Sequence, residues 1–363
     1  MILERSMSKA ATPWPLVVAV ALLVTAGLVN LYSSTRGNQP QAFYQQLIWL
    51  GVSLVLWVPG LLVDYRVLDK LSRLVWLVVV ALLVAVLFTR PISGAHRWII
   101  LGPLHVQPSE LVKLALILVL AHHYQNMERP GPYGMKDLVK PLAYTSVPAV
   151  LVLLEPDLGT SLIILFIGLT MILLAGVKRK TLAVLALAGL VAIPMAWNYG
   201  LRDYQKTRIL TLLGGGDKTG AGYHSYQSLI AVGSGELWGK GYLEGTQNQM
   251  RFLPEQHTDF AFAVWAEEFG FVGSFLLLAV YGLILWLGLL VAWLAREKFG
   301  LFLAGGVMAL LFFHVAVNIG MVIGLLPVVG MTLPLFSYGG SSLLVFMLGI
   351  ALVVNVHQRR QMF

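Results

Sequence analysis

The chain has 363 residues, of which 58% are hydrophobic and 12% charged, and its mean hydropathy is +0.79. A soluble domain carries about twice that charged fraction, so the composition excludes an ordinary soluble protein and predicts an integral membrane protein. The formal net charge is +8. The basic residues fall mostly in short loops between apolar runs, which is typical of orientation signals and argues against nucleic-acid binding. Because the chain has no cysteine, disulfides, thiolate nucleophiles and cysteine-based metal sites are excluded.

Ten apolar runs are candidate membrane spans, because a bilayer core of ~30 Å needs about 20 helical residues. They lie at residues 14–32, 43–63, 72–89, 109–124, 142–155, 158–176, 181–199, 259–295, 300–326 and 339–356. The first run is long for the apolar part of a signal peptide and lacks a cleavage site, so we interpret it as a retained span. The eighth run is longer than a bilayer, so it is either tilted or made of two pieces. We expect an all-α polytopic integral membrane protein of about ten transmembrane helices, with residues 1–363 forming a single domain.

Lysine and arginine residues are concentrated in the short loops on one side of these spans. The positive-inside rule assigns that side to the cytoplasm, so both termini are predicted to be cytoplasmic. Residues 200–258, between spans seven and eight, then form one large extracellular loop. Its frequent glycines and scattered aromatic residues predict short interfacial helices and turns.

The stretch RFLPEQHTDF ends at the outer mouth of the eighth span and brings His257 and Asp259 next to apolar sequence. Asp259 is either the N-cap of that helix or a general base or metal ligand at the water boundary, and these two roles are compatible. Glu267 and Glu268 lie two turns further in, where ionisable groups are costly. We expect them to be packing or supporting partners, with Lys113 as a candidate partner.

The run QPSELVKLA opens the fourth span. Ser109 is a candidate cap, and Glu110 and Lys113 lie at i and i+3 on one helix face. The two are either a self-contained structural ion pair or contacts to a ligand. Their position on the same outer side as Asp259 favours the ligand role.

Two outer turns carry further charged candidates. In GAHRWIILGP, Arg97 beside Trp98 is either an interfacial anchor or a phosphate clamp. In LLEPDLGTS, Asp157 either caps the next helix or joins Glu155 and Asp259 in a carboxylate cluster. Such a cluster is suited to a divalent cation, Mg²⁺ or Mn²⁺, that orients a hydroxyl.

The stretch PLFSYGGSS lies before the tenth span. Ser337, Gly339 and Gly340 predict either close helix packing or a site for a phosphorylated head group near a helix N-terminus. His314 and Asn318, at i and i+4 in span nine, are predicted to make inter-helix hydrogen bonds rather than a metal site.

Six motifs, in order and across nearly the whole chain, resemble those of the SEDS family (shape, elongation, division and sporulation). They are GAHRWI, QPSELVKLA, EPDLGTS, YQSLIAVGSGELWGKGY, FLPEQHTDFAFAVWAEEFG and FSYGGSS. The form of FLPEQHTDF is more similar to the elongation branch of the family than to the division branch. One departure is His96, where many relatives have arginine, and this thins the basic patch beside Arg97.

The resemblance implies a multi-pass peptidoglycan glycosyltransferase of the bacterial cytoplasmic (inner) membrane, with its active site on the outer face. Such enzymes polymerise lipid II during cell elongation and rod-shape maintenance, and their partner is a class B penicillin-binding protein that acts as transpeptidase. Asp259 matches the essential aspartate of the family. We infer an inverting transfer in which Asp259 takes the acceptor hydroxyl's proton, directly or through a bound cation, while Arg97, Lys113 or loop arginines neutralise the pyrophosphate.

The predicted substrate-binding residues are Arg97, Glu110, Lys113, Glu155, Asp157, His257, Ser337, Gly339 and Gly340, and Asp259 is the candidate metal ligand. We expect a divalent cation and no organic cofactor, with lipid II and membrane lipids as further partners. Two alternatives stay open. One is a flippase of a lipid-linked precursor, because intramembrane charge is also typical of transporters. The other is a non-enzymatic scaffold for a transpeptidase.

Overall fold

The computed structural model describes residues 13–36, 39–89, 96–101, 104–128, 131–212, 222–249 and 255–360. The long helices are α2 (Trp14–Thr35), α3 (Pro40–Leu62), α4 (Tyr65–Val86), α5 (Pro108–Gln125), α6 (Val139–Leu154), α7 (Leu158–Ala175), α8 (Arg179–Met195), α12 (Ala261–Trp293), α13 (Lys298–Val322) and α14 (Gly340–Arg359). The shorter helices are η1 (Met135–Leu138), η2 (Ala196–Gly200), α9 (Asp203–Leu212), α10 (Tyr223–Ser234) and α11 (Thr246–Gln249). Strands β1 (Ile99–Leu101) and β2 (Leu104–Val106) pair antiparallel as a small hairpin.

Within the described residues, eight helices are long and apolar enough to cross a membrane. They overlap eight of the predicted spans and confirm a polytopic membrane protein. The other two predicted spans correspond to α4 and α5, which are less apolar, so the exact number of ten stays a prediction. The predicted start of the third span at residue 72 is wrong. Asp64 caps α4 by accepting a hydrogen bond from the backbone nitrogen of Arg66 at 2.9 Å, and charged residues in the first turns hid this helix start.

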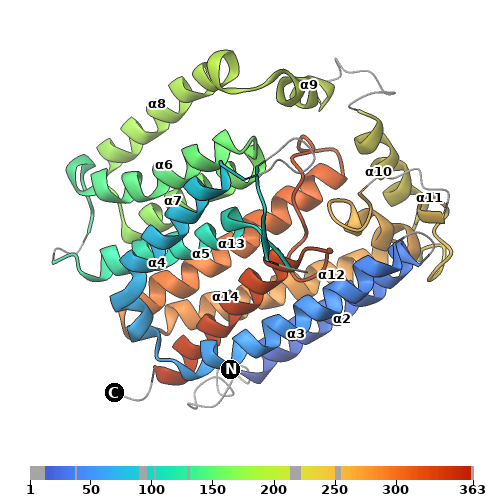
Figure 1. The fold of residues 1–363 in the computed structure, drawn as a ribbon, viewed down its shortest axis with the longest axis horizontal. Helices are drawn as coiled ribbons and strands as arrows, with labels where there is room; N and C mark the ends of the chain where they lie inside the picture. The colour runs from blue at the N-terminus through green and yellow to red at the C-terminus, as the bar shows by residue number, and fades with distance from the viewer. Residues whose placement is uncertain are drawn as a thin grey trace.

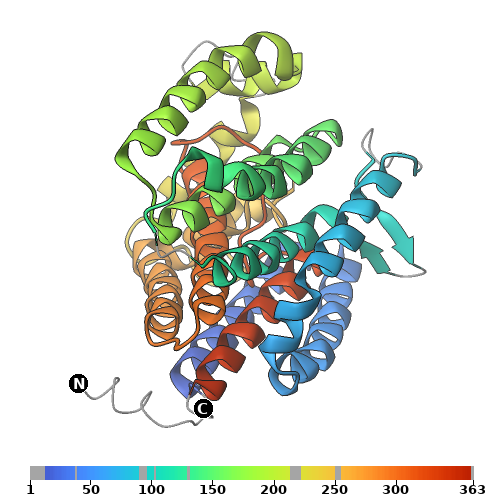
Figure 2. The same ribbon diagram turned by 90° about the vertical axis from the view of Figure 1, so that its left-hand side faces the viewer.

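The helices form a bundle with α14 and α13 inside it and α8 on its edge (Figures 1 and 2). In the most apolar stretch of α14, 83% of the residues are buried, compared with 6% in the stretch that spans α8 and η2. An apolar helix without protein neighbours is stable only where lipid covers it. Helix α8 stands away from the bundle and leads the chain to α9 (Figure 1).

The eighth span is broken at Gly270, whose φ of 66° and ψ of −162° are confined to glycine. A Cβ at this position would lie 2.3 Å from a backbone nitrogen of the facing loop, residues 233–245. That loop replaces the interrupted helical hydrogen bonds. Lys240 N donates to Glu267 O at 3.0 Å and Phe271 N donates to Glu236 O at 2.8 Å. The span is therefore two helical pieces, and the glycine-rich loop holds the piece before Gly270. The short helices expected between residues 200 and 258 are α9, α10 and α11.

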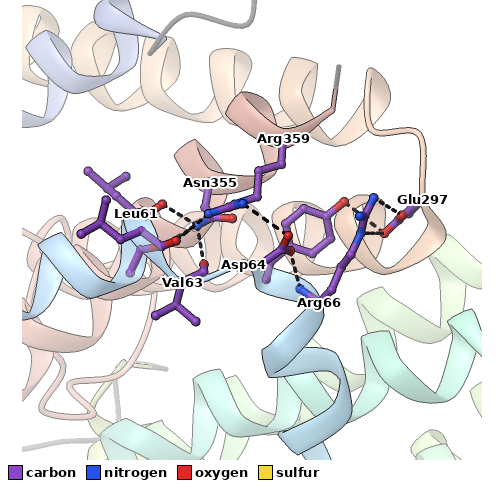
Figure 3. A network of polar contacts seen from close by, with 10 residues as sticks. Leu61, Val63, Asp64, Arg66, Glu297, Asn355 and Arg359 are labelled. Carbon is purple, nitrogen blue, oxygen red and sulfur yellow. Dashed lines mark hydrogen bonds and ion pairs between the residues drawn. The ribbon is translucent and has the colours of Figure 1, made fainter. Parts of the chain in front are cut away.

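A polar network joins the end of α3, the starts of α4 and α13 and the end of α14, at the end of the bundle away from Gly270 (Figure 3). Asn355 of α14 donates from its side-chain nitrogen to three backbone carbonyls at the end of α3, at 3.0, 2.8 and 2.7 Å. Arg359 lies 3.3 Å from Asp64, and Arg66 pairs with Glu297 at 2.6 Å. Figure 1 shows that α2 begins near the end of α14, which agrees with the prediction that both termini share one side.

Candidate active site

A cavity of about 740 Å³ lies at the end of the bundle where α5, α7 and α14 begin. Its volume is in the range of pockets that hold ligands of drug size or larger. The predicted site residues that line it are Arg97, Glu110, Asp157, Asp259, Gly339 and Gly340. Lys113, Glu155, His257 and Ser337 are not among its lining residues. The first residues of the GAHRWI and FLPEQHTDF motifs lie outside the described residues.

Asp259 lies in the turn before α12 and borders the cavity. The predicted N-cap role is wrong, because α12 begins at Ala261 with Phe260 as its N-cap and no side chain bonds to the first-turn amides. Burial, and then the charge of Glu255, raise the pKa of Asp259 to about 6, while a hydrogen bond from Thr258 opposes the rise. A carboxylate with this pKa is ionised at neutral pH and more basic than a free aspartate, which suits a general base.

Two side chains of α13 contact the residues around the cavity. The predicted inter-helix contact is confirmed for His314, which meets Lys113 of α5, whereas Asn318 bonds to backbone outside the helices. Asn318 donates to the backbone carbonyl of Asp259 at 2.9 Å. His314 lines the cavity, and its Nε2 lies 2.9 Å from Lys113 Nζ.

Glu110 and Lys113 form a close ion pair in the first turns of α5. Lys113 Nζ lies 2.6 Å from Glu110 Oε1, and the lysine side chain is fully buried. Glu110 borders the cavity, whereas Lys113 reaches it only through Glu110 and His314. The predicted cap at Ser109 is wrong, because α5 already begins at Pro108. Proline has no backbone N–H, so this first position of the helix has no donor that a cap would have to bind.

Glu267 and Glu268 are not partners of Lys113, so that expectation is wrong. Glu267 pairs with Lys240 Nζ at 2.7 Å, and Glu268 accepts a hydrogen bond from the hydroxyl of Ser33. Both carboxylates face the loop before α11 and helix α2 rather than α5. They anchor the piece of α12 that precedes Gly270.

Arg97 holds the turn between α6 and α7. Its Nε donates to the carbonyl of Glu155 at 3.0 Å, its guanidinium also donates to the carbonyl of Pro156, and Nη1 lies 3.8 Å from Asp157 Oδ2. Asp157 caps α7 by accepting from Thr160 N at 3.1 Å, as one of its two predicted roles required. Arg97 therefore presents a positively charged group to the cavity from a position fixed by the backbone.

Glu155 is completely buried beneath this turn. Burial, with Asp157 adding to it, raises the pKa of Glu155 to about 8, although Arg97 opposes the rise. Its carboxyl is therefore mostly protonated at neutral pH. The predicted cluster of ionised carboxylates around Asp259 accordingly lacks the charge of Glu155.

The FSYGGSS segment supplies another part of the cavity wall. Gly339 and Gly340 line the cavity, while the buried hydroxyl of Ser337 accepts a hydrogen bond inside its own turn. Tyr338 N donates to the carbonyl of His257 at 2.9 Å, and their rings lie 5.6 Å apart. Burial lowers the pKa of His257 and so favours its neutral form, although the charge of Glu255 opposes this shift.

Helix α9 contributes cavity residues that were not singled out from the sequence. Tyr204 donates to the carbonyl of Pro156 at 3.1 Å, and Arg208 donates to the carbonyl of Val328 at 2.9 Å. Because these side chains lie at i and i+4, one face of α9 connects two walls of the cavity. The i and i+4 spacing predicts that the two side chains share one face of α9, but it does not predict where that face docks.

The residues at the cavity do not form a metal cage on their own. Across the described part of the chain, no group of three or more histidine, aspartate or glutamate side chains could hold a metal ion. Glu255, Asp157 and Asp259 all border the cavity, but they are too dispersed to form such a group. The divalent cation stays a prediction.

Comparisons with known proteins agree with these features. The family model described as "Cell cycle protein", for FtsW, RodA and SpoVE, matches residues 11–362. The peptidoglycan glycosyltransferase MrdB of Escherichia coli K12 is 42% identical over 352 residues, covering 96% of this chain and 94% of the relative. The MrdB of Helicobacter pylori J99 is 38% identical, covering 96% and 90%.

Solved structures show the same fold. A chain from a peptidoglycan synthase complex that coordinates polymerization and crosslinking superposes with a TM-score of 0.83 at 36% identity, covering 97% of this chain and 99% of that one. The rod shape determining protein RodA of Thermus thermophilus superposes with a TM-score of 0.72 at 34% identity, covering 97% and 98%. The chain belongs to the FtsW/RodA/SpoVE family of cell cycle proteins, the SEDS family whose motifs it carries.

Proposed function

We propose that this protein is a peptidoglycan glycosyltransferase that polymerises lipid II into glycan strands during cell elongation. The relatives named peptidoglycan glycosyltransferase support this activity, and the RodA likeness supports the elongation role. The observation that carries the proposal is the Asp259 carboxylate, with its pKa of about 6, at the edge of a cavity that two arginines also line.

The reaction is an inverting sugar transfer. An acceptor sugar hydroxyl attacks the anomeric carbon of the donor, a new C–O bond forms, and the bond to the undecaprenyl pyrophosphate breaks. Asp259 accepts the hydroxyl proton as this happens, which general base catalysis requires. The pyrophosphate leaves with the electron pair of the broken bond.

Arg97 and Arg208 are the residues we assign to this leaving group. Both line the cavity, and both are held by backbone carbonyls, so their charges are in place before the pyrophosphate forms. Preorganised charge of this kind stabilises a developing anion more than mobile charge does. Lys113 is set apart from this role by its burial and its bond to Glu110.

A divalent cation is kept as a proposal with a separate test. Because the side chains in the described part of the chain form no group of three or more metal ligands, oxygens of the substrate would have to complete the coordination that Asp259 begins. Loss of polymer after treatment with EDTA, restored by Mg²⁺ or Mn²⁺, supports a cation requirement. Full activity in EDTA contradicts it.

The protein is a multi-pass membrane protein, and we propose the bacterial inner membrane with the cavity on the outer face. The distribution of basic residues supports this orientation. A class B penicillin-binding protein is the proposed partner, because one similar chain comes from a synthase complex that couples polymerization to crosslinking. We also propose that residues 1–363 form a single domain.

One assay separates this function from its two alternatives. The purified protein, in liposomes with its penicillin-binding partner, is given lipid II and a divalent cation, and products are analysed for glycan chains. Polymer supports the glycosyltransferase. Translocation of lipid II without polymer indicates a flippase, and the absence of both indicates a scaffold.

A further inference from the structure

Asn318 of α13 joins two backbone segments beside Asp259. Its side chain is completely buried. The Nδ2 group donates to the carbonyl of Asp259 at 2.9 Å and to the carbonyl of Met331 at 2.5 Å. One amide nitrogen therefore uses both of its hydrogens on the backbone of the candidate site.

The two segments meet at the Asp259 carboxylate. Residues 327–332, which include Met331, line the cavity outside any helix. A Cβ added at Gly330 would lie 3.4 Å from Asp259 Oδ2, so the loop packs directly against the carboxylate. The position of this group depends on how the loop and the turn before α12 are held together.

Buried carbonyls outside regular structure need a donor from elsewhere. Asn318 supplies donors to both carbonyls from inside α13, a rigid helix. Aspartate at this position would turn an acceptor oxygen toward the two carbonyls, and alanine would leave both unbonded. Asparagine is therefore suited to this position by its chemistry as well as by its size.

We propose that Asn318 is a positioning residue that fixes the Asp259 carboxylate where it meets the acceptor hydroxyl. This inference rests on the proposed glycosyltransferase function. Asn318 affects the proton-transfer step only through Asp259, because its side chain contacts the backbone of Asp259 and does not line the cavity. A displacement of about 1 Å at a reacting group can lower a rate by about 100-fold.

The test compares Asn318→Ala with a matched control, Asn355→Ala. Asn355 is also completely buried and also donates from its Nδ2 to backbone carbonyls, but it lies in the network at the other end of the bundle (Figure 3). Both variants are expected to lower the melting temperature. Only Asn318→Ala is expected to lower kcat for polymerisation, by about 100-fold, with KM for lipid II changed by less than roughly threefold.

Equal kcat values for the two folded variants overturn the inference. If Asn318→Ala does not fold, Asn318→Asp keeps the size of the side chain, and a wild-type kcat in that variant overturns the inference equally. Wild-type protein is assayed in parallel. Absence of polymer from the wild type contradicts the proposed function and this inference with it, whereas a normal kcat in the Asn318 variants contradicts this inference alone.

Discussion

At the scale of single residues, the environment of Asp259 decides whether it can act as a base. Burial and the nearby Glu255 raise its pKa, while Thr258 and Arg208 lower it, and the balance is about 6. The sequence predicted Asp259 as the catalytic residue from its place at a span mouth and from the family motif. The helix start at Ala261 and the neighbour Arg208 depend on tertiary packing and could not be read from local sequence.

The pH dependence of polymerisation tests this balance. Because the base must be ionised, kcat/KM should rise with pH up to about 6 and then level off. Glu255→Gln removes a negative neighbour and should move this limb to lower pH. Arg208→Ala removes a positive neighbour and should move it to higher pH. If the rising part of the pH profile moved in the same direction in both variants, the ionisation that controls kcat/KM would not be that of Asp259.

Glu155 makes a second prediction at this scale. Its folded pKa of about 8 lies above the ordinary value of 4.5, so its contribution to stability is complete below 4.5 and is lost as pH rises through 8. Glu155→Gln keeps the side-chain size and removes the ionisation. Between pH 5 and pH 8 the free energy of unfolding of the wild type should fall relative to that of this variant, by an amount on the order of a few kcal/mol, and its melting temperature should fall with it. Parallel melting curves over that range would show that Glu155 does not stay protonated.

At the scale of elements, the existence of the apolar spans followed from the length of the apolar runs, but their ends and breaks did not. The eighth run predicted either a tilted helix or two pieces, and Gly270 decides for two pieces. The break depends on backbone bonds from residues 236–241, which are distant in sequence. The start of α4 was misplaced for a local reason, because charged residues in its first turns obscured the cap at Asp64.

Two glycines of α12 provide a matched test of this break. Gly270→Ala places a Cβ at a positive φ and against the backbone of the facing loop, so it should destabilise the protein by more than about 1–3 kcal/mol. Gly282→Ala lies in the same helix with nothing within 4 Å of the new Cβ, and it should leave the protein unchanged or stabilise it. Melting temperatures of the two purified variants check this. Equal stability would mean that α12 is continuous through Gly270.

At the scale of the whole molecule, the orientation rule placed the charged motifs on one side, and the structure brings most of them to one cavity. Arg97, Glu110, Asp157 and Asp259 come from four separate segments and share its wall. The sequence could not predict which charged residues do not reach the cavity. Lys113 does not line it, because its amine is bound to Glu110 and His314 inside the bundle. The cover formed by α9 was also not predictable, since a short polar helix in a long loop carries little information about where it docks.

The absence of cysteine allows a direct test of the orientation. Glu244→Cys lies on the exposed loop before α11, and Lys298→Cys lies exposed at the start of α13 on the opposite side. A membrane-impermeant maleimide applied to intact spheroplasts should label the first variant only, and lysis should expose the second. Labelling of Lys298→Cys in intact spheroplasts would reverse the proposed topology.

The most direct measurement of the central claim is the polymerisation rate of Asp259→Asn in liposomes with the penicillin-binding partner and lipid II. This change keeps the size of the side chain and removes its basicity, so polymer formation should fall by about 100-fold or more, the range of general base catalysis. Binding of lipid II and the melting temperature should stay close to those of the wild type. Polymer formed at the wild-type rate by the folded variant would contradict the role of Asp259 as the catalytic base.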